Sequence, residues 1–509
     1  MTREDEVAST DEIVEHSAVE LRRLIGTRQL SPVELLDACI ERVEAINPAI
    51  NAVCATDFDR ARDQAKSDAD KVVSGEPLGL LHGLPVGVKD LQDTKGLLTT
   101  YGSALHKDHV PDADEDAVAR VRAAGANLFC KTNTPTFGAG ANSRNPVWGA
   151  TGNPFNPVLN AGGSSGGSAA GLAVDMMPLA TGSDTGGSLR IPASYCGVVG
   201  FRPSPGTVPV GKRPFGWLPI SVTGPMARNV ADTCLLMAAQ AAFETGDPLS
   251  YPQDPAQYLV PERVDLGGLR AAFSTDLGFA PIDHDYRADF AAKIDPISAF
   301  FGHAEQADPD LGEVDKVFDV IRGAVYLGRF REEYERDPDS LGPNPKANYE
   351  IAMAMTLGDH AWAHVEQTRI YHEFQTFFER FDVLITPTVP ISPFPWEQLA
   401  LTEMNGETLR NYYHWLAPTY GITITGHPAI SIPCGVDRNG MPFGVQVVGP
   451  HRGDRFVLGV AHALEQAFAG DPSLMRPVPN LEKLAQPTPS LVSIVTDPPS
   501  QSFPARPAG

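Results

Sequence analysis

The chain has 509 residues, of which 42% are hydrophobic and 20% charged, so it is long enough to bury a sizeable core as a globular protein. Its formal charge of −23 argues against the clustered Lys and Arg that a nucleic-acid surface or an anionic membrane surface requires. The acidic N-terminus lacks the apolar core of a signal peptide, and no run of about 18 apolar residues occurs, so we expect neither a secreted nor a membrane protein.

The first readable elements alternate between helix and strand. A helix is predicted to begin at the N-cap Ser31, with Glu34 completing a capping box, and to end at Pro48. Residues 84–89 (LPVGVK) indicate a short buried strand that ends in a lysine. Residues 114–133 indicate a helix, a glycine turn and a second strand. This alternation favours an α/β architecture.

Further along the chain, a small-residue helix is predicted over 167–177, which places Ser164 and Ser165 near its N-terminus. Another helix is predicted over 230–243. Residues 245–400 differ in composition, with acidic segments, histidines and aromatics, and their pattern does not allow helices or strands to be assigned.

The C-terminal part has a clearer pattern. Residues 421–449 predict two strands joined by an Asp-Arg-Asn-Gly turn, and residues 454–468 predict a helix. The last 25 or so residues are rich in Pro and Ser, which is typical of a disordered or loosely draped tail.

The cysteines are scattered, with no CxxC pair and no short metal-ligand spacing. This pattern predicts neither a disulfide framework nor a zinc site. Reduced thiols fit a cytoplasmic protein, and the cytoplasm is the location that we expect. The six positions are Cys39, Cys54, Cys130, Cys196, Cys234 and Cys434.

The stretch 162–192 offers two serines in glycine-rich settings, Ser164 and Ser188, but no histidine to take a proton from either. Glycines beside a serine allow positive φ and can aim several N–H groups at one anion, although a tight turn has the same composition. Phosphate binding is disfavoured because no GK[ST] ending and no GxGxxG after a strand occurs. The G-x-S-x-G pattern at 162–166 would make Ser164 the nucleophile of an α/β-hydrolase, which would then need a distant histidine.

Residues 162–204 resemble, almost position by position, the signature of the amidase signature family of serine hydrolases. Residues 82–103 are similar to the family's lysine segment, 131–157 to the loop that follows it, and 426–450 to its C-terminal segment. The resemblance covers most of residues 15–475 and is weakest between 245 and 400.

The resemblance implies a Ser-cisSer-Lys triad. Ser188 matches the nucleophile, Ser164 matches the bridging serine that follows a cis peptide bond from Gly163, and Lys89 matches the general base. The base must be neutral, so burial has to lower a pKa that is ordinarily near 10.4. The resemblance also implies an oxyanion hole made by backbone N–H groups, those of Thr185, Gly186, Gly187 and Ser188.

Two charged residues within the signature have a structural explanation. Asp184 and Arg190 flank the expected nucleophile, and we expect a buried pair that holds the loop rather than a substrate contact.

His360 and His364 have the i, i+4 spacing of metal ligands but lack the glutamate of an HExxH motif, so a helix face is the better interpretation.

The resemblance implies one α/β domain with the amidase signature fold, a large mixed and twisted β-sheet covered by helices on both faces. It implies hydrolysis of a carboxamide through an acyl-enzyme, with esters or carbamates as side substrates, and neither metal nor cofactor. We expect a small-molecule amide as partner, no nucleic acid and no membrane, with a homodimer as an option. The expected parts are an N-terminal arm (1–15), an amidase domain (16–480) with a catalytic core (75–235), a divergent region (245–400) and a C-terminal core segment (421–470), and a tail (485–509).

Two other functions remain open. The transamidation subunit of the glutamine-dependent tRNA amidotransferase shares the triad, but this chain has TPTFG at 134–138 where that subunit typically carries Met-Asp-Glu-Phe. A non-catalytic binding protein is disfavoured because all three triad positions are filled. The substrate cannot be named from the sequence. We expect its pockets to be lined by 133–150, 195–220 and the divergent region, with these aromatics available: Tyr195, Phe215, Trp217, Trp362 and Tyr412.

Overall fold

The computed structural model describes residues 10–500, so the expected N-terminal arm and C-terminal tail lie partly outside the described residues, at 1–9 and 501–509. The centre of the molecule is an eleven-stranded sheet with the order β1-β3-β2-β8-β10-β9-β16-β17-β13-β11-β12. Its strands are β1 (Val53–Thr56), β2 (Pro85–Lys89), β3 (Asn127–Thr132), β8 (Leu179–Asp184), β9 (Val199–Arg202), β10 (Val222–Ala227), β11 (Arg270–Phe273), β12 (His303–Gln306), β13 (Val383–Pro387), β16 (Ala429–Val436) and β17 (Pro442–Val448).

The sheet is mixed, as expected. Strand β2 runs parallel to both of its neighbours, β3 and β8, and β11 runs parallel to β12 and β13. The remaining neighbours in the sheet pair antiparallel. Short two-stranded ribbons are formed by β4 (Arg144–Asn145) with β5 (Gly149–Ala150), β6 (Gly152–Asn153) with β7 (Asn156–Asn160), and β14 (Glu403–Met404) with β15 (Glu407–Thr408).

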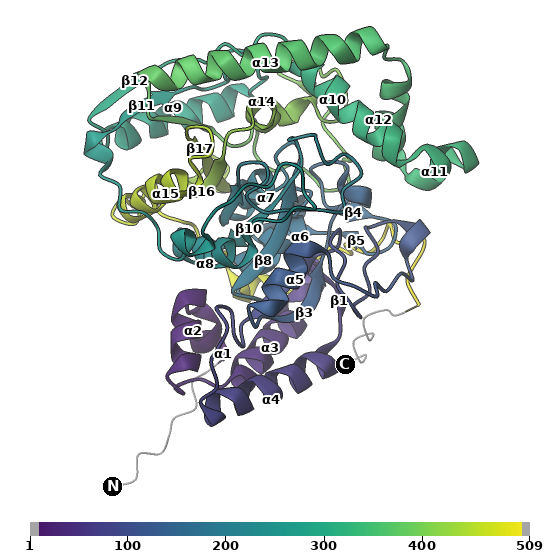
Figure 1. Ribbon diagram of the computed structural model, residues 1–509, viewed down its shortest axis with the longest axis vertical. Helices are drawn as coiled ribbons and strands as arrows, with labels where there is room; N and C mark the ends of the chain where they lie inside the picture. Colours follow the sequence, from purple (N-terminus) through teal and green to yellow (C-terminus); the bar gives the residue numbers. More distant parts are fainter. Residues whose placement is uncertain (1–9, 501–509) are drawn as a thin grey trace.

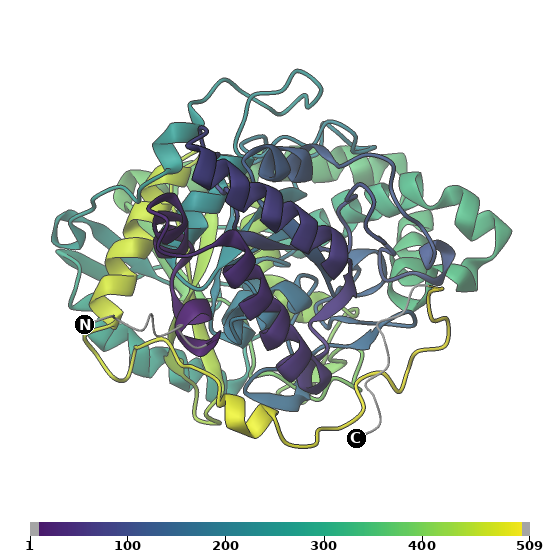
Figure 2. The same cartoon turned by 90° about the horizontal axis from the view of Figure 1, so that it is seen from below.

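Helices enclose the sheet. Figure 1 shows α2 to α4 at one end of the molecule and α10 to α13 at the other, with β8 and β10 between them. Seen from below, the purple N-terminal helices lie across the front (Figure 2). The helices are α1 (Thr10–Glu15), α2 (Ala18–Gly26), α3 (Pro32–Ile50), α4 (Phe58–Ser74), α5 (Asp116–Ala123), α6 (Gly166–Ala173), α7 (Arg190–Cys196), α8 (Val230–Gln240), α9 (His284–Ser298), α10 (Val314–Arg329), α11 (Arg331–Arg336), α12 (Pro343–Met353), α13 (Leu357–Arg380), α14 (Ala417–Thr425), α15 (Asp454–Phe468) and α16 (Leu481–Leu484).

The capping box that starts α3 is confirmed, because the Ser31 side chain accepts from Val33 N–H and Glu34 accepts from Ser31 N–H. The expected stop at Pro48 is wrong. A proline gives up one backbone donor, but here the helix continues to Ile50, which is buried, and ends at Asn51 with φ of 49°.

A second correction concerns residues 421–425 (GITIT), which we expected to begin a strand. They form the last turns of α14, and every residue of this helix is buried. A helix without a polar face carries no amphipathic period, so its apolar run cannot be distinguished from a strand by pattern alone. The two strands that follow, β16 and β17, are confirmed, and so is α15.

The arrangement of β2, β8 and α6 positions the site. Strands β2 and β8 are adjacent and parallel, so their C-terminal ends reach the same edge of the sheet. Lys89 is the last residue of β2, and the loop that carries Ser188 follows β8 directly. The topology therefore brings a lysine and a serine that are 99 positions apart to one edge.

Within 485–500, residues 491–497 lie against β5 and the turn that precedes it. Leu491 is buried there, and its carbonyl accepts a hydrogen bond from Ala150 N–H at 2.7 Å. Among the described residues, no helix combines the length and the apolar character that crossing a membrane requires.

Candidate active site

Lys89 is delivered to the site by a strand whose five residues are all buried. Its side chain is 0% exposed, and Nζ donates to Ser164 Oγ at 2.7 Å and to Ser183 Oγ at 3.1 Å. Burial lowers the pKa of Lys89 to about 7, against the opposing effect of Asp184 and Glu115. A large share of this amine is therefore neutral at pH 7, as a general base must be.

Ser164 lies just before α6, as expected. The peptide bond from Gly163 to Ser164 is cis, and Ser164 is 2% exposed. The next residue, Ser165, is the N-cap of α6, and its N–H donates to the carbonyl of Ser188 at 3.2 Å. This bond connects the loop of the expected bridging serine to the loop of the expected nucleophile.

Ser188 lies on the loop between β8 and α7 and is partly exposed. It shares a cavity of about 210 Å³ with Ser164 and Ser183. Within residues 10–500, the side chains of Ser164 and Ser188 form no hydrogen bond with each other. The structure thus shows the contact between Lys89 and Ser164 directly, and it brings Ser188 to the same cavity.

The backbone of the loop 185–188 differs in one respect from the expected oxyanion hole. The N–H of Gly187 donates to Asp184 Oδ1 at 2.9 Å, so this donor is already engaged. The N–H groups of Thr185, Gly186 and Ser188 form no hydrogen bond within the described part of the chain. Three of the four expected donors therefore have no hydrogen-bond partner among the described residues.

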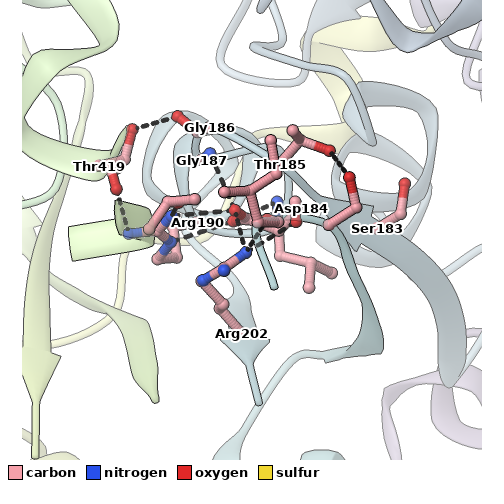
Figure 3. Close-up of polar contacts among 12 residues, drawn as sticks. Ser183, Asp184, Thr185, Gly186, Gly187, Arg190, Arg202 and Thr419 are labelled. Carbon is pink, nitrogen blue, oxygen red and sulfur yellow. Dashed lines mark hydrogen bonds and ion pairs between the residues drawn. The ribbon is translucent and has the colours of Figure 1, made fainter. Parts of the chain in front are cut away.

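Asp184 holds this loop in place by accepting hydrogen bonds from the N–H groups of Gly187 and Leu189 (Figure 3). It is fully buried, and Arg190 binds it through Nε at 3.0 Å and Nη2 at 2.9 Å, while Arg202 Nη1 lies 3.1 Å away. Burial alone would raise the pKa of Asp184, but the two arginines hold it well below its ordinary value. The expected buried pair of Asp184 and Arg190 is confirmed as part of a larger cluster.

The same cluster reaches the C-terminal half of the chain. Arg190 Nη1 donates to the carbonyl of Thr419 at 2.9 Å and to Gln446 Oε1 at 2.5 Å. The Thr419 hydroxyl in turn donates to the carbonyl of Gly186 at 2.6 Å (Figure 3). Sequence reasoning missed these partners because nothing local in the sequence links residues more than 200 positions away.

The cavity lining corrects the expected aromatic set, since none of the five named aromatics lines it. Tyr195 is buried elsewhere, with its hydroxyl donating to the carbonyl of Ile391, and Trp217 is 78% exposed. The expected ranges are confirmed, because 133–150, 195–220 and, through α10, the divergent region all contribute to the lining. The sequence did not single out Ser183 or any individual residue of α10. The cavity is lined by Leu91, Phe137, Gly138, Gly140, Ser164, Ser183, Thr185, Gly186, Ser188, Val210, Arg213, Ile220, Ser221, Val222, Thr223, Arg322, Val325, Tyr326, Arg329, Phe330 and Leu416.

His360 and His364 lie on the same face of α13, with ring centroids 4.7 Å apart. Over residues 10–500, no group of three or more His, Cys, Asp or Glu side chains is arranged to hold a metal ion. The two rings contact each other, which fits the interpretation as a helix face.

The sequence profile of the Amidase family matches residues 34–458, so the chain belongs to this family. An acylamidase of Rhodococcus erythropolis is 33% identical over 458 residues, covering 88% of this chain and 94% of that protein. A glutamyl-tRNA(Gln) amidotransferase component from Acidothermus cellulolyticus is 32% identical over 490 residues, covering 90% of this chain and 95% of that protein.

Solved structures agree with this assignment. A bacterial aryl acylamidase of the amidase signature family superposes with a TM-score of 0.81 at 27% identity, covering 90% of this chain and 96% of that one. A 6-aminohexanoate cyclic dimer hydrolase in complex with its substrate gives a TM-score of 0.77 at 28% identity, covering 94% and 100%. The fold is thus the amidase signature fold, and the relatives support hydrolysis of amide bonds as the activity.

Proposed function

We propose that this protein hydrolyses a carboxamide to a carboxylate and an amine or ammonia through an acyl-enzyme on Ser188. Ser188 Oγ attacks the carbonyl carbon while its proton passes to Ser164 and the proton of Ser164 passes to Lys89. The ammonium of Lys89 then returns a proton through Ser164 to the leaving nitrogen. Water hydrolyses the ester by the same relay, and activated esters or carbamates are side substrates.

The observation that carries this proposal is the hydrogen bond of a buried lysine, with a pKa of about 7, to Ser164. A lysine with only a structural role at a strand end would extend its ammonium to water or, like the buried Lys131, donate to oxygens that do not line the cavity. Burial at the cavity instead supplies the base that the histidine-free signature lacks.

The tetrahedral intermediate places a negative charge on the carbonyl oxygen. We propose that the N–H groups of Thr185, Gly186 and Ser188 stabilise it, with Gly187 N–H serving the loop through Asp184. Donors fixed by a buried ion-pair cluster need no reorganisation when the charge forms, which is the main source of catalysis in such sites.

A fluorophosphonate tests the assignment of the nucleophile. We expect peptide mapping to find the label on Ser188, and Ser188→Ala to abolish both labelling and amide turnover. Ser168→Ala is the matched control, because Ser168 also lies in the signature but bonds to Thr132 and Thr181 in the core. A label on Ser164 or Ser165 would show that the roles are reversed.

The transamidation subunit is the second candidate, because a component of that enzyme is 32% identical to this chain. The TPTFG segment and the acylamidase relative favour an amidase that works alone. Gel filtration with activity measurement of the purified chain separates the two, and it also tests the homodimer. We further propose a cytoplasmic location, which all six cysteines, being buried and free, support.

A further inference from the structure

The cavity at Ser188 carries positive charge that the proposed chemistry does not use. Three arginines line it, Arg213, Arg322 and Arg329, and no aspartate or glutamate does so in the part of the chain that the structure describes. The chain as a whole has a formal charge of −23, so this lining differs in sign from the protein that surrounds it.

Two of these arginines have ordinary environments. Arg213 Nη2 contacts both carboxylate oxygens of Asp247, at 3.0 and 3.2 Å, so its charge is neutralised. Arg329 is exposed, and its guanidinium lies 5.8 Å from the ring centre of Phe137 and 5.0 Å from that of Phe330. Water can therefore solvate the charge of Arg329.

Arg322 has neither a carboxylate partner nor water around most of its side chain. It is 6% exposed, and its Nε donates to Asn348 Oδ1 at 2.9 Å. Its Nη2 donates to the phenol oxygens of Tyr326 and Tyr412, at 3.1 and 2.9 Å. Its third nitrogen, Nη1, makes no hydrogen bond to any described residue. Arg322 lines the cavity, so a bound ligand could accept this hydrogen bond.

The neighbours of Arg322 do not supply a counter-charge. Burial raises the pKa of Tyr326 to about 12, so this phenol is neutral at pH 7. Asp319, one turn earlier on α10, is engaged by Arg410 Nη1 at 2.6 Å and by the hydroxyl of Tyr413 at 2.8 Å. The Arg322 guanidinium also lies 5.0–5.7 Å from the ring centres of Phe318, Tyr326 and Tyr413, which stabilise a cation without neutralising it. A guanidinium cannot lose its proton in a protein, so its buried charge has neutral partners only among the described residues. An anion in the cavity would supply the partner.

We propose that Arg322 is a specificity-determining residue that binds a carboxylate of the substrate, so that the preferred amides carry a carboxylate beyond the bond that is cleaved. This inference rests on the proposed function, because Ser188 and Arg322 line the same cavity. One buried guanidinium without a carboxylate partner matches one singly charged group, and its planar fork matches the geometry of a carboxylate.

The shape of the site supports a small substrate. The cavity of about 210 Å³ has room for a short acyl or aryl group, and Phe137, Tyr326 and Phe330 supply its aromatic lining. Arg322 and Arg329 lie seven residues apart on α10, which puts both on one face of the helix. The exposed Arg329 would attract the same anion before it reaches Arg322.

Two pairs of probes test the proposal. The first is the 4-nitroanilide of glutaric acid against that of 5-methylhexanoic acid, whose terminal isopropyl group has the shape of a carboxylate. The second is 4-acetamidobenzoate against 4-isopropylacetanilide, which places the charge on the amine side. We expect the carboxylate member of at least one pair to have a kcat/KM at least about 30-fold higher. Equal or lower values for the carboxylate members of both pairs would overturn the proposal.

Variants of Arg322 test the residue itself. We expect Arg322→Gln to remove most of the preference by slowing the carboxylate member, and Arg322→Lys, which keeps the charge but not the fork, to retain part of it. Arg331→Gln is the matched control, because it removes the same charge from an exposed position on α11 that does not line the cavity. A loss of the same size for both members of a pair would assign Arg322 a structural role alone.

A binding measurement separates this inference from the proposed function. By calorimetry, glutarate should bind the wild type and Arg331→Gln alike and bind Arg322→Gln at least about 10-fold more weakly. Glutarate binding without turnover of any amide would sink the proposed function and leave the anion site standing. Turnover of amides without a carboxylate preference would leave the proposed function standing and overturn the carboxylate site. If Arg322→Gln does not fold, the ratio of kcat/KM between the two members of each probe pair, measured on the wild type, decides whether the proposal stands.

Discussion

Lys89 Nζ and Ser164 Oγ lie 2.7 Å apart inside the protein, although 75 positions separate the two residues in the chain. The contact exists because α6 packs against β2, so that the residues just before α6 lie beside the last residue of β2. It places a primary amine beside a hydroxyl in a site that excludes water from the amine, which is 0% exposed. The catalytic consequences follow from the protonation state of that amine.

The first prediction concerns pH. Because burial lowers the pKa of Lys89 to about 7, raising the pH through 7 converts the ammonium into the neutral base. We expect kcat/KM for an amide to be low at pH 5, to rise with a midpoint near 7 and to level off by pH 8.5. A midpoint near 10, or a flat profile from pH 5 to 9, would show that Lys89 does not limit the reaction.

Much of this site could be predicted from the sequence, because the signature is one continuous segment. The glycines and serines of 162–188 determine a loop, a helix start and a strand end locally, and the structure has each in place. The mixed sheet and the pairing of Asp184 with Arg190 were also predicted, and both are confirmed.

The features that the sequence does not predict depend on long-range contacts. Thr419 approaches Gly187 only because α14 packs onto the loop, and α14 itself has the pattern of a strand because it is buried all round. Helix α10 contributes Arg322 from a region without readable motifs. The proposed role of Arg322 depends on its having no carboxylate partner among the described residues, and a local sequence pattern cannot predict that.

The second prediction concerns the ion-pair cluster. Asp184→Asn leaves Arg190 and Arg202 buried without a charged partner, so we expect the free energy of unfolding to fall by about 3–5 kcal/mol. Urea denaturation measures the change. Asp63→Asn is the control, since Asp63 pairs with Lys66 while its side chain is 79% exposed, and its midpoint should not move. Equal midpoints for both variants would contradict the assigned role of the cluster.

The third prediction concerns Gly187, which has a φ of 126° and allows a close approach of Thr419. A Cβ at this position would lie 2.2 Å from Thr419 Oγ1, so Gly187→Ala must displace the loop. Because the displaced donors would no longer point at the oxyanion, we expect kcat to fall by about 10²-fold or more. Gly440→Ala is the control, because Gly440 also has positive φ but no atom within 4 Å of its Cβ position. A folded Gly187→Ala enzyme with normal kcat would exclude these N–H groups as the oxyanion donors.

The role of Lys89 as the base is tested most directly by comparing an amide with a matched activated ester in Lys89→Ala. In the proposed mechanism the amide needs two proton transfers at this residue, one from Ser188 through Ser164 to Lys89 and one from Lys89 back to the leaving amine, whereas a good leaving group departs from the ester with little protonation. We expect kcat/KM for the amide to fall by at least about 10²–10⁴-fold and that for the ester to fall less. A folded Lys89→Ala variant with near-normal amidase activity would contradict the account, because the proton acceptor would then lie elsewhere.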